Sequence, residues 1–596
     1  MNNKIPKRSE LKKEDCWNLS KLFAGDTEWE MSLKDYERKM AGIEDFKGNL
    51  GKSPENLKNC LDFMMEMEIL DERLGYYAYL KTEENAGDSK NQERLARFTS
   101  LSSKKEALSS YQIPEIQAIP DSTMKSFLSS KSLEDYVIFL TKILRLKPHV
   151  LSEKEEKLLA MQAEANQTAS KAFSVLTNVD FEFGLIETPE GKKPLTQSTY
   201  SAFLLNPDRQ IRKKAYDQFY SVFEKHKNTL TSLLAGSVHL DIYNSRVRNF
   251  PSARAAKLFP DKVSEKVYDN LISTVNDNLD LLHRYYDFRR KSMNLDFLHL
   301  YDLYVPLVND MDVRHTYDEA VEKVIDSLHP LGGEYCSVLK NGLLNGWVDR
   351  YENQGKSSGA FSAGSYPGDP YILMNFKEEV LRDVFTLAHE GGHSMHSWYS
   401  VANNPVQHYN YTIFEAEVAS TFNEQLLAKY MLDGSESKEM EAYLLGKQID
   451  DIIGTIYRQT MFAEFEHIIH RMTENNHPLT VDSVREEYTK LLRKYFGNRV
   501  KFEDNSNLEG LRIPHFYRSF YVYKYATGLA ASISLSKKVL EGGGKDREDY
   551  LRFLKSGGSK YPVESLKLAG VDMSKTEPVE NAMGVFKDLL TRLEKL

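Results

Sequence analysis

Apolar residues recur three and four positions apart along most of the chain, with Glu, Lys, Gln and Arg between them. This spacing places the apolar side chains on one face of an α-helix, and it predicts a helix wherever it is sustained. The longest segments of this kind cover residues 56–80, 92–113, 152–175, 209–243, 266–292, 438–474 and 481–496. We therefore expect a mainly α, multi-helix fold.

Patterns typical of strands are scarce. Residues 179–183 (Val-Asp-Phe-Glu-Phe) alternate between apolar and polar side chains, and residues 188–191 (Thr-Pro-Glu-Gly) supply a turn, so we expect a hairpin near 178–196. A second, short strand is predicted over 371–375. No tandem repeat or low-complexity linker marks a domain boundary. We place the boundary near 195–205, between an N-terminal helical domain at 1–200 and a second domain at 201–596.

The composition argues against several classes of protein. The 596 residues carry a net charge of −9 without a clustered basic face, so we expect no nucleic-acid partner. No segment is apolar over the length of a membrane span, and the N-terminal residues lack the apolar core of a secretory signal. Cys16, Cys60 and Cys336 are far apart, which indicates free thiols in a reducing compartment. We expect a cytoplasmic protein that does not act at a membrane; the sequence does not determine its oligomeric state, for which a monomer is favoured.

An H-E-x-x-H motif occupies residues 389–393, inside a helix predicted over 377–399. Positions i and i+4 lie nearly above one another on a helix, so His389 and His393 can bind one metal ion from one face. Glu390 lies one step round the helix, where it can take a proton from a water on that ion, as zinc hydrolases require. Gly391 and Gly392 each cost about 1 kcal/mol relative to Ala in a helix, which indicates that substrate or a neighbouring strand comes close there. The motif makes 201–596 the candidate catalytic domain.

The predicted strand at 371–375 leads directly into this helix. Asn375 is a favourable N-cap and Glu378 follows three positions later, in the pattern of a capping box. The edge of such a strand can pair with an extended peptide by strand addition, although plain packing of the strand is the alternative. Tyr371 and Leu373 are therefore candidate substrate-binding residues.

A catalytic zinc ion usually has three protein ligands and a water. The candidates for the third ligand are His396 and the carboxylates of Glu415, Glu417 and Glu424. Tyr399 stands six positions after the second histidine of the motif, where the three-histidine class needs a further histidine, so a glutamate is the better candidate. Glu417 and Glu424 are seven apart and share a helix face, whereas Glu415 points away from both. This pair is consistent with one metal ligand and one partner that orients a ligating histidine.

The motif and the glutamate segment together resemble the thimet-oligopeptidase-like family of zinc metallopeptidases. The resemblance is carried by residues 389–396 (His-Glu-Gly-Gly-His-Ser-Met-His) and 417–424 (Glu-Val-Ala-Ser-Thr-Phe-Asn-Glu), and supported by 366–376, 513–528, 569–573 and 577–580. It runs from about Trp17 to the end of the chain. It implies that Glu417 is the third zinc ligand and that His396 is not a ligand. This chain departs from the family at Glu415, where relatives usually carry an apolar residue. Glu415 therefore stays a minor alternative to Glu417 as the third ligand.

The family resemblance also has implications for the fold of the whole molecule and for its substrates. It implies a zincin-type metallopeptidase with one Zn²⁺ ion per chain and a small β element beside the active-site helix. It also implies a helical shell around a deep channel that admits short unstructured peptides and excludes folded proteins. Oligopeptides are therefore the expected substrates.

A cluster of tyrosines follows His515. Tyr517, Tyr521 and Tyr525 recur four positions apart and would share one helical stripe, which a buried core could also explain. Peptide hydrolysis builds negative charge on the carbonyl oxygen, and phenol or imidazole donors stabilise it. Family members use a histidine and one or more tyrosines of the equivalent segment for this purpose. We take His515 with Tyr521 or Tyr525 as the catalytic donors, and Tyr517 and Tyr523 as substrate contacts, with Tyr523 off the stripe.

The predicted function is that of a zinc-dependent endopeptidase for short oligopeptides. His389, His393 and Glu417 would hold the ion, Glu424 would orient a ligand, and Glu390 would activate the metal-bound water. One alternative is an exopeptidase of the same fold, such as a dipeptidyl carboxypeptidase. Another is a non-catalytic peptide-binding protein, whose sequence signature would be loss of the base or of the third ligand; neither is lost.

Overall fold

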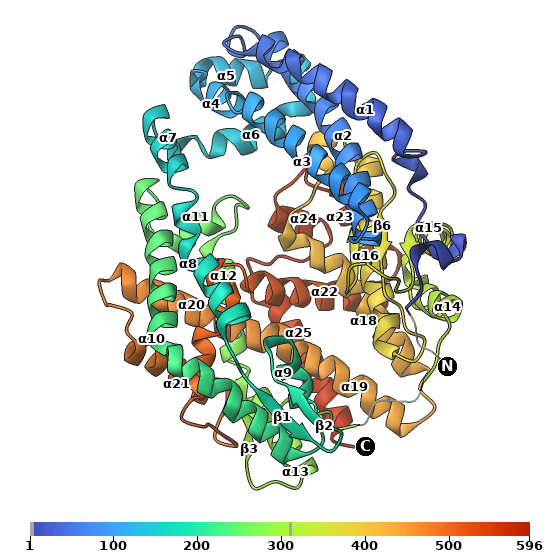
Figure 1. The fold of residues 1–596 in the computed structure, drawn as a ribbon, viewed down its shortest axis with the longest axis vertical. Coiled ribbons are helices and arrows are strands. Elements are labelled where there is room, and N and C mark those ends of the chain that lie inside the picture. The colour runs from blue at the N-terminus through green and yellow to red at the C-terminus, as the bar shows by residue number, and fades with distance from the viewer. Residues whose placement is uncertain (1–4, 309–312) are drawn as a thin grey trace. The chain divides into compact units, whose positions relative to one another are not determined.

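The computed structural model describes residues 5–308 and 313–596 and is mainly helical, with 71% of the chain in helices and 3% in strands (Figure 1). The predicted fold class is therefore confirmed. The chain packs into two compact units, each made of three separate stretches. Within the described residues, unit 1 comprises 5–148, 313–433 and 534–571, and unit 2 comprises 149–308, 434–533 and 572–596.

Three of the predicted helices form as single elements, α2 (Pro54–Glu84), α10 (Arg209–Val247) and α21 (Val481–Phe496), and a fourth, 92–113, is mainly α3 (Ser89–Ser109) but reaches the start of α4 (Gln112–Ala118). The other three are interrupted. The segment 152–175 divides into α7 (Glu153–Met161) and α8 (Thr168–Val175), and 266–292 divides into α12 (Glu265–Asn276) and α13 (Leu279–Ser292). In 438–474 a π-helical turn at Ile453–Tyr457 joins α19 (Lys438–Ile452) to α20 (Arg458–Glu474). Apolar periodicity continues through such breaks, so it cannot locate them.

The predicted hairpin is present but shorter than expected. It pairs β1 (Leu185–Thr188) with β2 (Gly191–Pro194) in antiparallel register. The alternating residues 179–183 are not a strand, because a π-helical turn at Leu176–Asp180 extends α8. Phe181 and Phe183 pack instead on the rings of α10, with Phe183 stacked 4.6 Å from Phe219. Burial of these rings, not a sheet face, explains the alternation.

The predicted boundary near 195–205 falls on α9 (Gln197–Leu204), which belongs to unit 2. Each compact unit consists of three separate stretches of the chain, so the units do not correspond to two domains on either side of one boundary. The split into 1–200 and 201–596 stays a prediction.

Unit 1 contains a three-stranded sheet. Its order is β4 (Val348–Asp349), β6 (Tyr371–Leu373) and β5 (Phe361–Ala363), with β6 parallel to β4 and antiparallel to β5. One face packs on α16 (Leu381–Asn403), where the hydroxyl oxygens of Ser362 and Ser394 are 2.9 Å apart. The other face joins the hydrophobic core that α1 (Asp26–Lys39) and α2 form. The sheet thus fixes the position of α16 against the N-terminal helices.

Helix α16 begins at Leu381 and not directly after the strand, so the predicted N-cap is wrong. Asn375 donates its side-chain amide to the carbonyl oxygens of Ser357 and Gly359, at 3.0 Å each, and is not free to cap a helix. The carboxylate of Asp383 accepts the N–H of Lys377 at 2.9 Å, which ties the preceding loop to the first turn. Local sequence cannot reveal that the loop at 357–359 binds the side-chain amide of Asn375.

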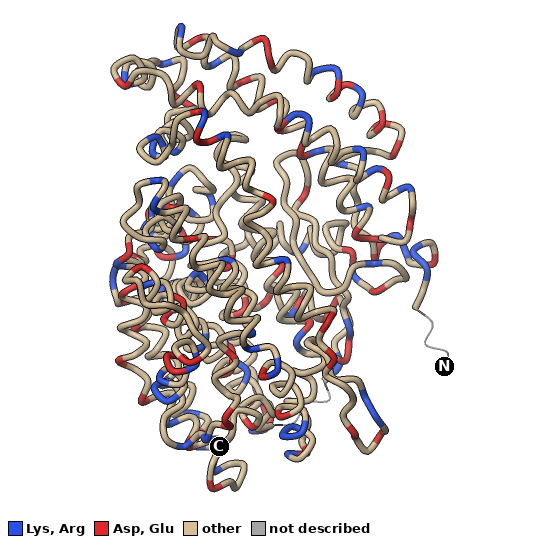
Figure 2. The backbone as a smooth tube through the Cα atoms, turned by 60° about the vertical axis from the view of Figure 1, so that its left-hand side comes forward, with Lys and Arg blue, Asp and Glu red and all other residues tan. Residues whose placement is uncertain are grey.

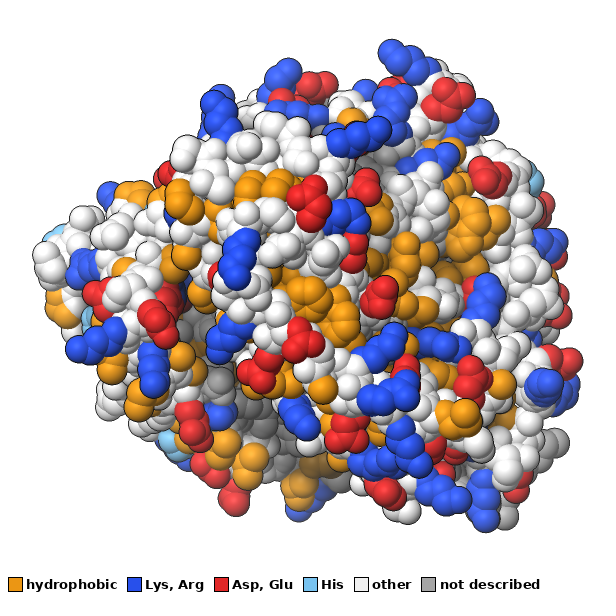
Figure 3. Space-filling view, turned by 90° about the horizontal axis from the view of Figure 1, so that it is seen from above, with side chains coloured by type: hydrophobic (Ala, Val, Ile, Leu, Met, Phe, Trp, Pro, Cys, Tyr) orange, Lys and Arg blue, Asp and Glu red, His pale blue; other side chains and the backbone are white. Residues whose placement is uncertain are grey.

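Acidic and basic residues are intermingled along the backbone of the described chain (Figure 2). The face drawn in Figure 3 shows the same mixture. Across residues 5–308 and 313–596, no helix is long and apolar enough to cross a membrane. Cys16, Cys60 and Cys336 are free thiols, as predicted.

Candidate metal centre

The motif-bearing helix α16 packs directly against α18 (Ile413–Asp433) in unit 1 (Figure 1). Gly392 permits this packing, because a Cβ atom there would lie 2.5 Å from the carbonyl oxygen of Ala419 and 2.7 Å from the Cα of Ser420. Gly391 faces the side chain of Leu339. The expectation that substrate or a strand approaches these glycines is therefore wrong: a neighbouring helix and a leucine fill the space.

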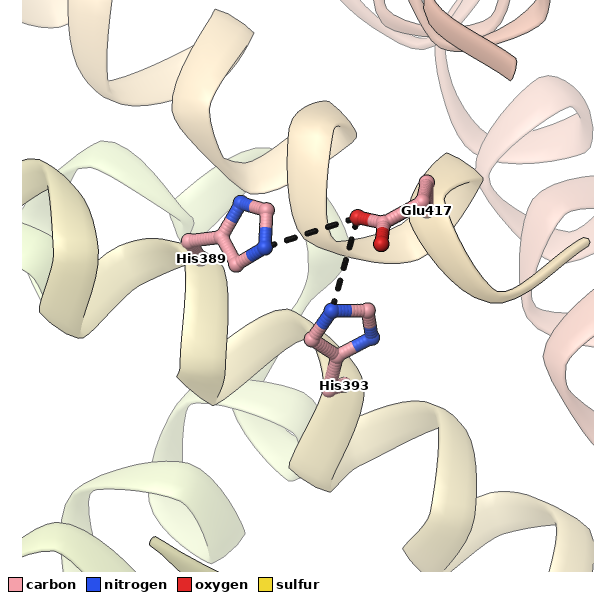
Figure 4. A group of neighbouring side chains, drawn as sticks. All are labelled: His389, His393 and Glu417. Atoms are coloured by element: carbon pink, nitrogen blue, oxygen red, sulfur yellow. Dashed lines mark ion pairs between the residues drawn. The ribbon is translucent and has the colours of Figure 1, made fainter. Parts of the chain in front are cut away.

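Three predicted ligands converge between these two helices (Figure 4). The Nε2 atoms of His389 and His393 lie 3.5 and 3.6 Å from Oε2 of Glu417, and the three ligand atoms are all within 4.8 Å of one another. Ligand atoms roughly 2.1 Å from a tetrahedral zinc ion stand about 3.4 Å apart, which follows from the usual bond lengths. The spacing of the three side chains therefore fits a single zinc ion.

Glu424 holds the first imidazole in the orientation that this site needs. Its Oε1 lies 3.1 Å from Nδ1 of His389, and Glu424 stands about two helical turns along α18 from Glu417. With the Nδ1 proton donated to Glu424, the lone pair of Nε2 faces Glu417. Such a carboxylate partner fixes both the tautomer and the ring orientation of a metal-binding histidine.

Negative charge is concentrated around the two imidazoles. Burial raises the pKa of Glu390, which lies next to His389 in the chain. Burial alone would lower the pKa of His389, but the carboxylates of Glu424, Glu390 and Glu417 raise it to about 9. Glu417 is also partly desolvated, yet the two histidines outweigh this effect and lower its pKa to about 2. A donor set with three carboxylates around two imidazoles favours a bound cation.

The two other candidate ligands face elsewhere. Glu415 is fully buried and accepts hydrogen bonds from the N–H and the hydroxyl of Thr412, at 3.3 and 3.2 Å, and burial raises its pKa to about 7. His396 is also fully buried, with its ring stacked 3.6 Å from that of Tyr411, and burial lowers its pKa to about 3. Neither residue belongs to the group of ligand atoms around Glu417.

The predicted substrate strand does not offer a free edge. β6 is the central strand of its sheet, hydrogen-bonded on both sides, and Tyr371 and Leu373 are fully buried in the core. The ring of Tyr371 packs edge-on against Trp17, 6.4 Å away. The assignment of these two residues to substrate binding is therefore wrong, because neither their side chains nor their backbone can reach a peptide.

β5 is an edge strand of the same sheet, and the sequence did not predict it. Residues 361–363 pair with β6 on one side, and no other strand of the described chain pairs with them. The strand is only three residues long and lies between Gly359 and Gly364. The alternation of Phe361, Ser362 and Ala363 between glycines was its only signal.

The segment after His515 is not one continuous helix. A 3₁₀ turn at Pro514–Tyr517 precedes a bend, and α22 (Tyr523–Gly542) begins only at Tyr523. Phe520 in the bend has φ of 54°, a left-handed conformation that no helix of L-residues can include. The expected stripe of tyrosines on one helix is therefore wrong.

The bend brings three of these residues together within unit 2. His515, Tyr521 and Tyr525 form one cluster: the Tyr525 hydroxyl lies 3.4 Å from Nε2 of His515, and the Tyr521 ring is 5.4 Å from that of Tyr525. Burial, helped by the positive charge of Arg518, lowers the pKa of His515.

The two tyrosines predicted as substrate contacts lie outside this cluster. Tyr523 is fully buried, with its ring 5.3 Å from that of Tyr268, so its predicted substrate contact is wrong. Tyr517 stacks on Phe173 with ring centroids 4.4 Å apart, and its hydroxyl is buried. These packing partners come from distant parts of the chain, which the local spacing of tyrosines cannot show.

Comparison with known families finds two matches. The family model described as peptidase family M3 matches residues 202–585, and the one described as oligopeptidase F matches residues 115–183. The first match covers the motif, the ligand-bearing helix α18 and the His515 cluster.

Full-length relatives and solved structures agree with these matches. An oligoendopeptidase F homologue of Borreliella burgdorferi is 43% identical, with 99% of each chain covered. Oligopeptidase PepF of Bacillus subtilis is 41% identical over 100% of this chain and 89% of the relative. The crystal structure of oligoendopeptidase-F from Enterococcus faecium superposes with a TM-score of 0.74 at 34% identity, covering 96% of this chain and 99% of that one.

Proposed function

The chain belongs to peptidase family M3, and on that premise we propose that it is a zinc-dependent endopeptidase that cleaves internal bonds of short oligopeptides. The resemblance expected from residues 389–396 and 417–424 is confirmed, and with it the activity of a metallo-oligopeptidase. The observation that carries the finer proposal is the convergence of His389, His393 and Glu417 from two packed helices.

We assign the metal ligands to these three residues, with one ion per chain. Two imidazole nitrogens and one carboxylate oxygen suit zinc, and three protein ligands leave a coordination position for water or substrate. A zinc ion held there supplies a Lewis acid, which polarises a peptide carbonyl and makes a water molecule more acidic. Glu424 keeps His389 in the tautomer that binding requires.

Glu390 is the residue that moves the proton. It follows the first ligand directly in the chain but is not one of the three ligands. Burial raises its pKa, so its carboxylate is a stronger base than that of an exposed glutamate. The carboxylate takes a proton from the attacking water and then passes it to the leaving amine.

His515, Tyr521 and Tyr525 are proposed as the donors that stabilise the developing oxyanion. Their mutual contacts hold the three polar groups in one cluster. The lowered pKa of His515 keeps its imidazole neutral at neutral pH, so that it donates a hydrogen bond without carrying a charge. Donors preorganised in this way need no rearrangement during the reaction.

The free edge of β5 is proposed as the place where the substrate backbone binds. A peptide in extended conformation would add to the sheet beyond residues 361–363, with main-chain hydrogen bonds that do not depend on sequence. This mode selects unfolded peptides, because a folded protein rarely presents an extended segment with free amides. Binding by strand addition agrees with the expected preference for short peptides. The cytoplasm is the proposed location of the enzyme.

The test combines metal analysis with a cleavage assay. The purified chain is assayed for zinc content and for cleavage of an internally quenched peptide with both ends blocked, before and after chelation. We expect one zinc ion per chain, cleavage inside the blocked peptide, loss of activity on chelation and recovery on zinc addition. Stoichiometric zinc without cleavage of any peptide would favour the binding protein, and cleavage only of peptides with free ends would favour the exopeptidase.

A further inference from the structure

A cavity of about 670 Å³ opens within unit 1 beside the metal centre. Its volume is in the range of roughly 300–1,000 Å³ that is usual for ligand-binding clefts. Most of its walls come from one face of α2, the adjoining face of α3, and the β5 strand with the residue that follows it, and residues of α16, of 409–413 and of α18 complete them. All of its lining residues belong to unit 1.

The wall formed by the N-terminal helices is aromatic. Tyr76 and Tyr79 project from α2, and Phe98 projects from α3. Gly75 lets the Phe98 ring lie against the backbone of α2, because a Cβ atom at Gly75 would stand 2.7 Å from the end of that ring. The ring of Phe361 on β5 continues this aromatic wall, because its centroid lies 5.6 Å from that of Tyr79 and the two rings are in contact.

The cavity adjoins both the free strand edge and the metal ligands. Residues 361–364 line it, so it runs along the edge of β5 that no strand of the described chain pairs with. Ala416, which precedes Glu417, lines it from α18, and Ser397, four positions after His393, lines it from α16. A peptide held on β5 would therefore place side chains in this cavity close to the metal ligands.

The alternation of side chains on β5 shows which peptide residues face the cavity. The side chain of Ser362 points towards α16, where it contacts Ser394, whereas Phe361 and Ala363 point towards the core shared with α2. A peptide strand beside β5 follows the same alternation. Every second side chain of the peptide would thus face the aromatic wall of α2 and α3.

The two carboxylates of the cavity are already engaged, which leaves a lining that is largely apolar and aromatic. Glu72 accepts hydrogen bonds from the Tyr409 hydroxyl and from the Tyr366 N–H, and Asp71 accepts one from the Tyr36 hydroxyl. In contrast, Tyr79 and Ile413 expose 37% and 42% of their surface although both are large and line the cavity.

We propose that this cavity is a specificity pocket for an aromatic side chain of the substrate, at a position near the scissile bond. The proposal rests on the proposed function, because it requires a peptide bound along β5. An aromatic ring would be enclosed by Tyr79, Phe98 and Phe361 in edge or offset contacts, which are favourable between aromatic rings. Removal of one wall of the pocket should weaken selectivity for aromatic residues and leave the chemical step intact.

The experiment compares quenched, end-blocked peptides that are built of Ala and Gly and carry one Phe, one Lys or no large residue at each position around the cleaved bond. For the wild-type enzyme we expect kcat/KM to rise about 10- to 100-fold with Phe at one position or at two positions separated by one residue. Tyr79→Ala and Phe98→Ala should each reduce this ratio about fivefold or more, with the rate for the peptide without a large residue nearly unchanged.

Tyr430→Ala is the matched control. This tyrosine is 41% exposed in the same unit and does not line the cavity, so its removal should leave the Phe-to-Ala ratio within about twofold. The ratio does not depend on the amount of folded enzyme, so partial unfolding of a variant cannot imitate the result. An unchanged ratio in both cavity variants of an active enzyme, or a wild-type preference for Lys over Phe, overturns the pocket. Failure of the wild-type enzyme to cleave any of the peptides overturns the proposed function instead.

Discussion

Glu424 stands 3.1 Å from the Nδ1 atom of His389, on the side of the imidazole opposite to the Nε2 atom that faces Glu417. Two carboxylates seven residues apart on one helix thus face the two ring nitrogens of one histidine. The outer carboxylate decides which nitrogen carries the proton, and therefore which is free to bind a metal ion.

Glu424→Gln should weaken metal binding without removing a ligand. A neutral amide holds the imidazole less firmly, and loss of such a partner typically costs roughly 10- to 100-fold in metal affinity. The measurement is zinc competition against a chromophoric chelator. Asp433→Asn is the control, because Asp433 lies at the end of the same helix and pairs only with Lys429 among the ion pairs of the described chain. Equal zinc affinity in both variants would show that Glu424 does not orient the ligand.

Gly392→Ala should destabilise the protein and disturb the metal centre together. The added methyl group would meet the main chain of α18, which carries Glu417 and cannot rotate away. Overpacking of this kind costs about 1–3 kcal/mol, more than the gain of about 1 kcal/mol in helix propensity. The free energy of unfolding in urea and the zinc content should both fall.

Gly391→Ala provides the comparison for that variant. Its methyl group would lie 3.3 Å from a terminal carbon of Leu339, a flexible side chain that can move. The gain in helix propensity, about 1 kcal/mol, then offsets the small repacking cost, so stability and zinc content should stay near those of the wild type. Equal destabilisation of the two variants would contradict the role given to Gly392.

Glu390→Gln should separate metal binding from catalysis. Glutamine has the shape of glutamate but cannot take a proton from water, and a general base contributes typically about 10²–10⁴-fold to the rate. We expect kcat/KM to fall by that factor while zinc content stays at one ion per chain, because Glu390 is not among the three ligands. Wild-type turnover with zinc retained would remove Glu390 from the mechanism.

The candidate ligands could be found from sequence because they depend on local helical geometry, whereas the choice of Glu417 over Glu424 came from the family resemblance. Histidines four apart on α16 and glutamates seven apart on α18 share their faces whatever the rest of the chain does. The close contact of the two helices at Gly392 was not accessible, although the cost of a glycine within a helix signalled an unusual neighbour. Spacing identifies which side chains face the same way, but not which element they face.

The mistaken assignments concern residues whose exposure and backbone conformation depend on contacts with distant parts of the chain. Tyr371 and Leu373 lie on a strand that is central only because β4 and β5, from other parts of the chain, pair with both of its edges. The predicted tyrosine stripe does not form because the left-handed backbone at Phe520 interrupts the helix, and α22 begins only at Tyr523. A propensity for helix does not report such a bend, because the conformation is imposed by the packing around it.

His396→Phe should make stability less sensitive to acid. Burial lowers the pKa of His396 to about 3, and neither ring nitrogen has a hydrogen-bond partner within the described chain, so the imidazole is neutral when folded. Its unfolded pKa is about 6.5. Stability from the neutral ring is therefore full above pH 6.5 and is lost as pH falls towards 3, by about 1.4 kcal/mol at pH 5.5. Phenylalanine keeps the stacking on Tyr411 without a proton. Urea unfolding of the chelator-treated proteins at pH 7.5 and 5.5 should show a loss smaller by that amount in the variant, and equal losses would mean that His396 is protonated in the folded protein.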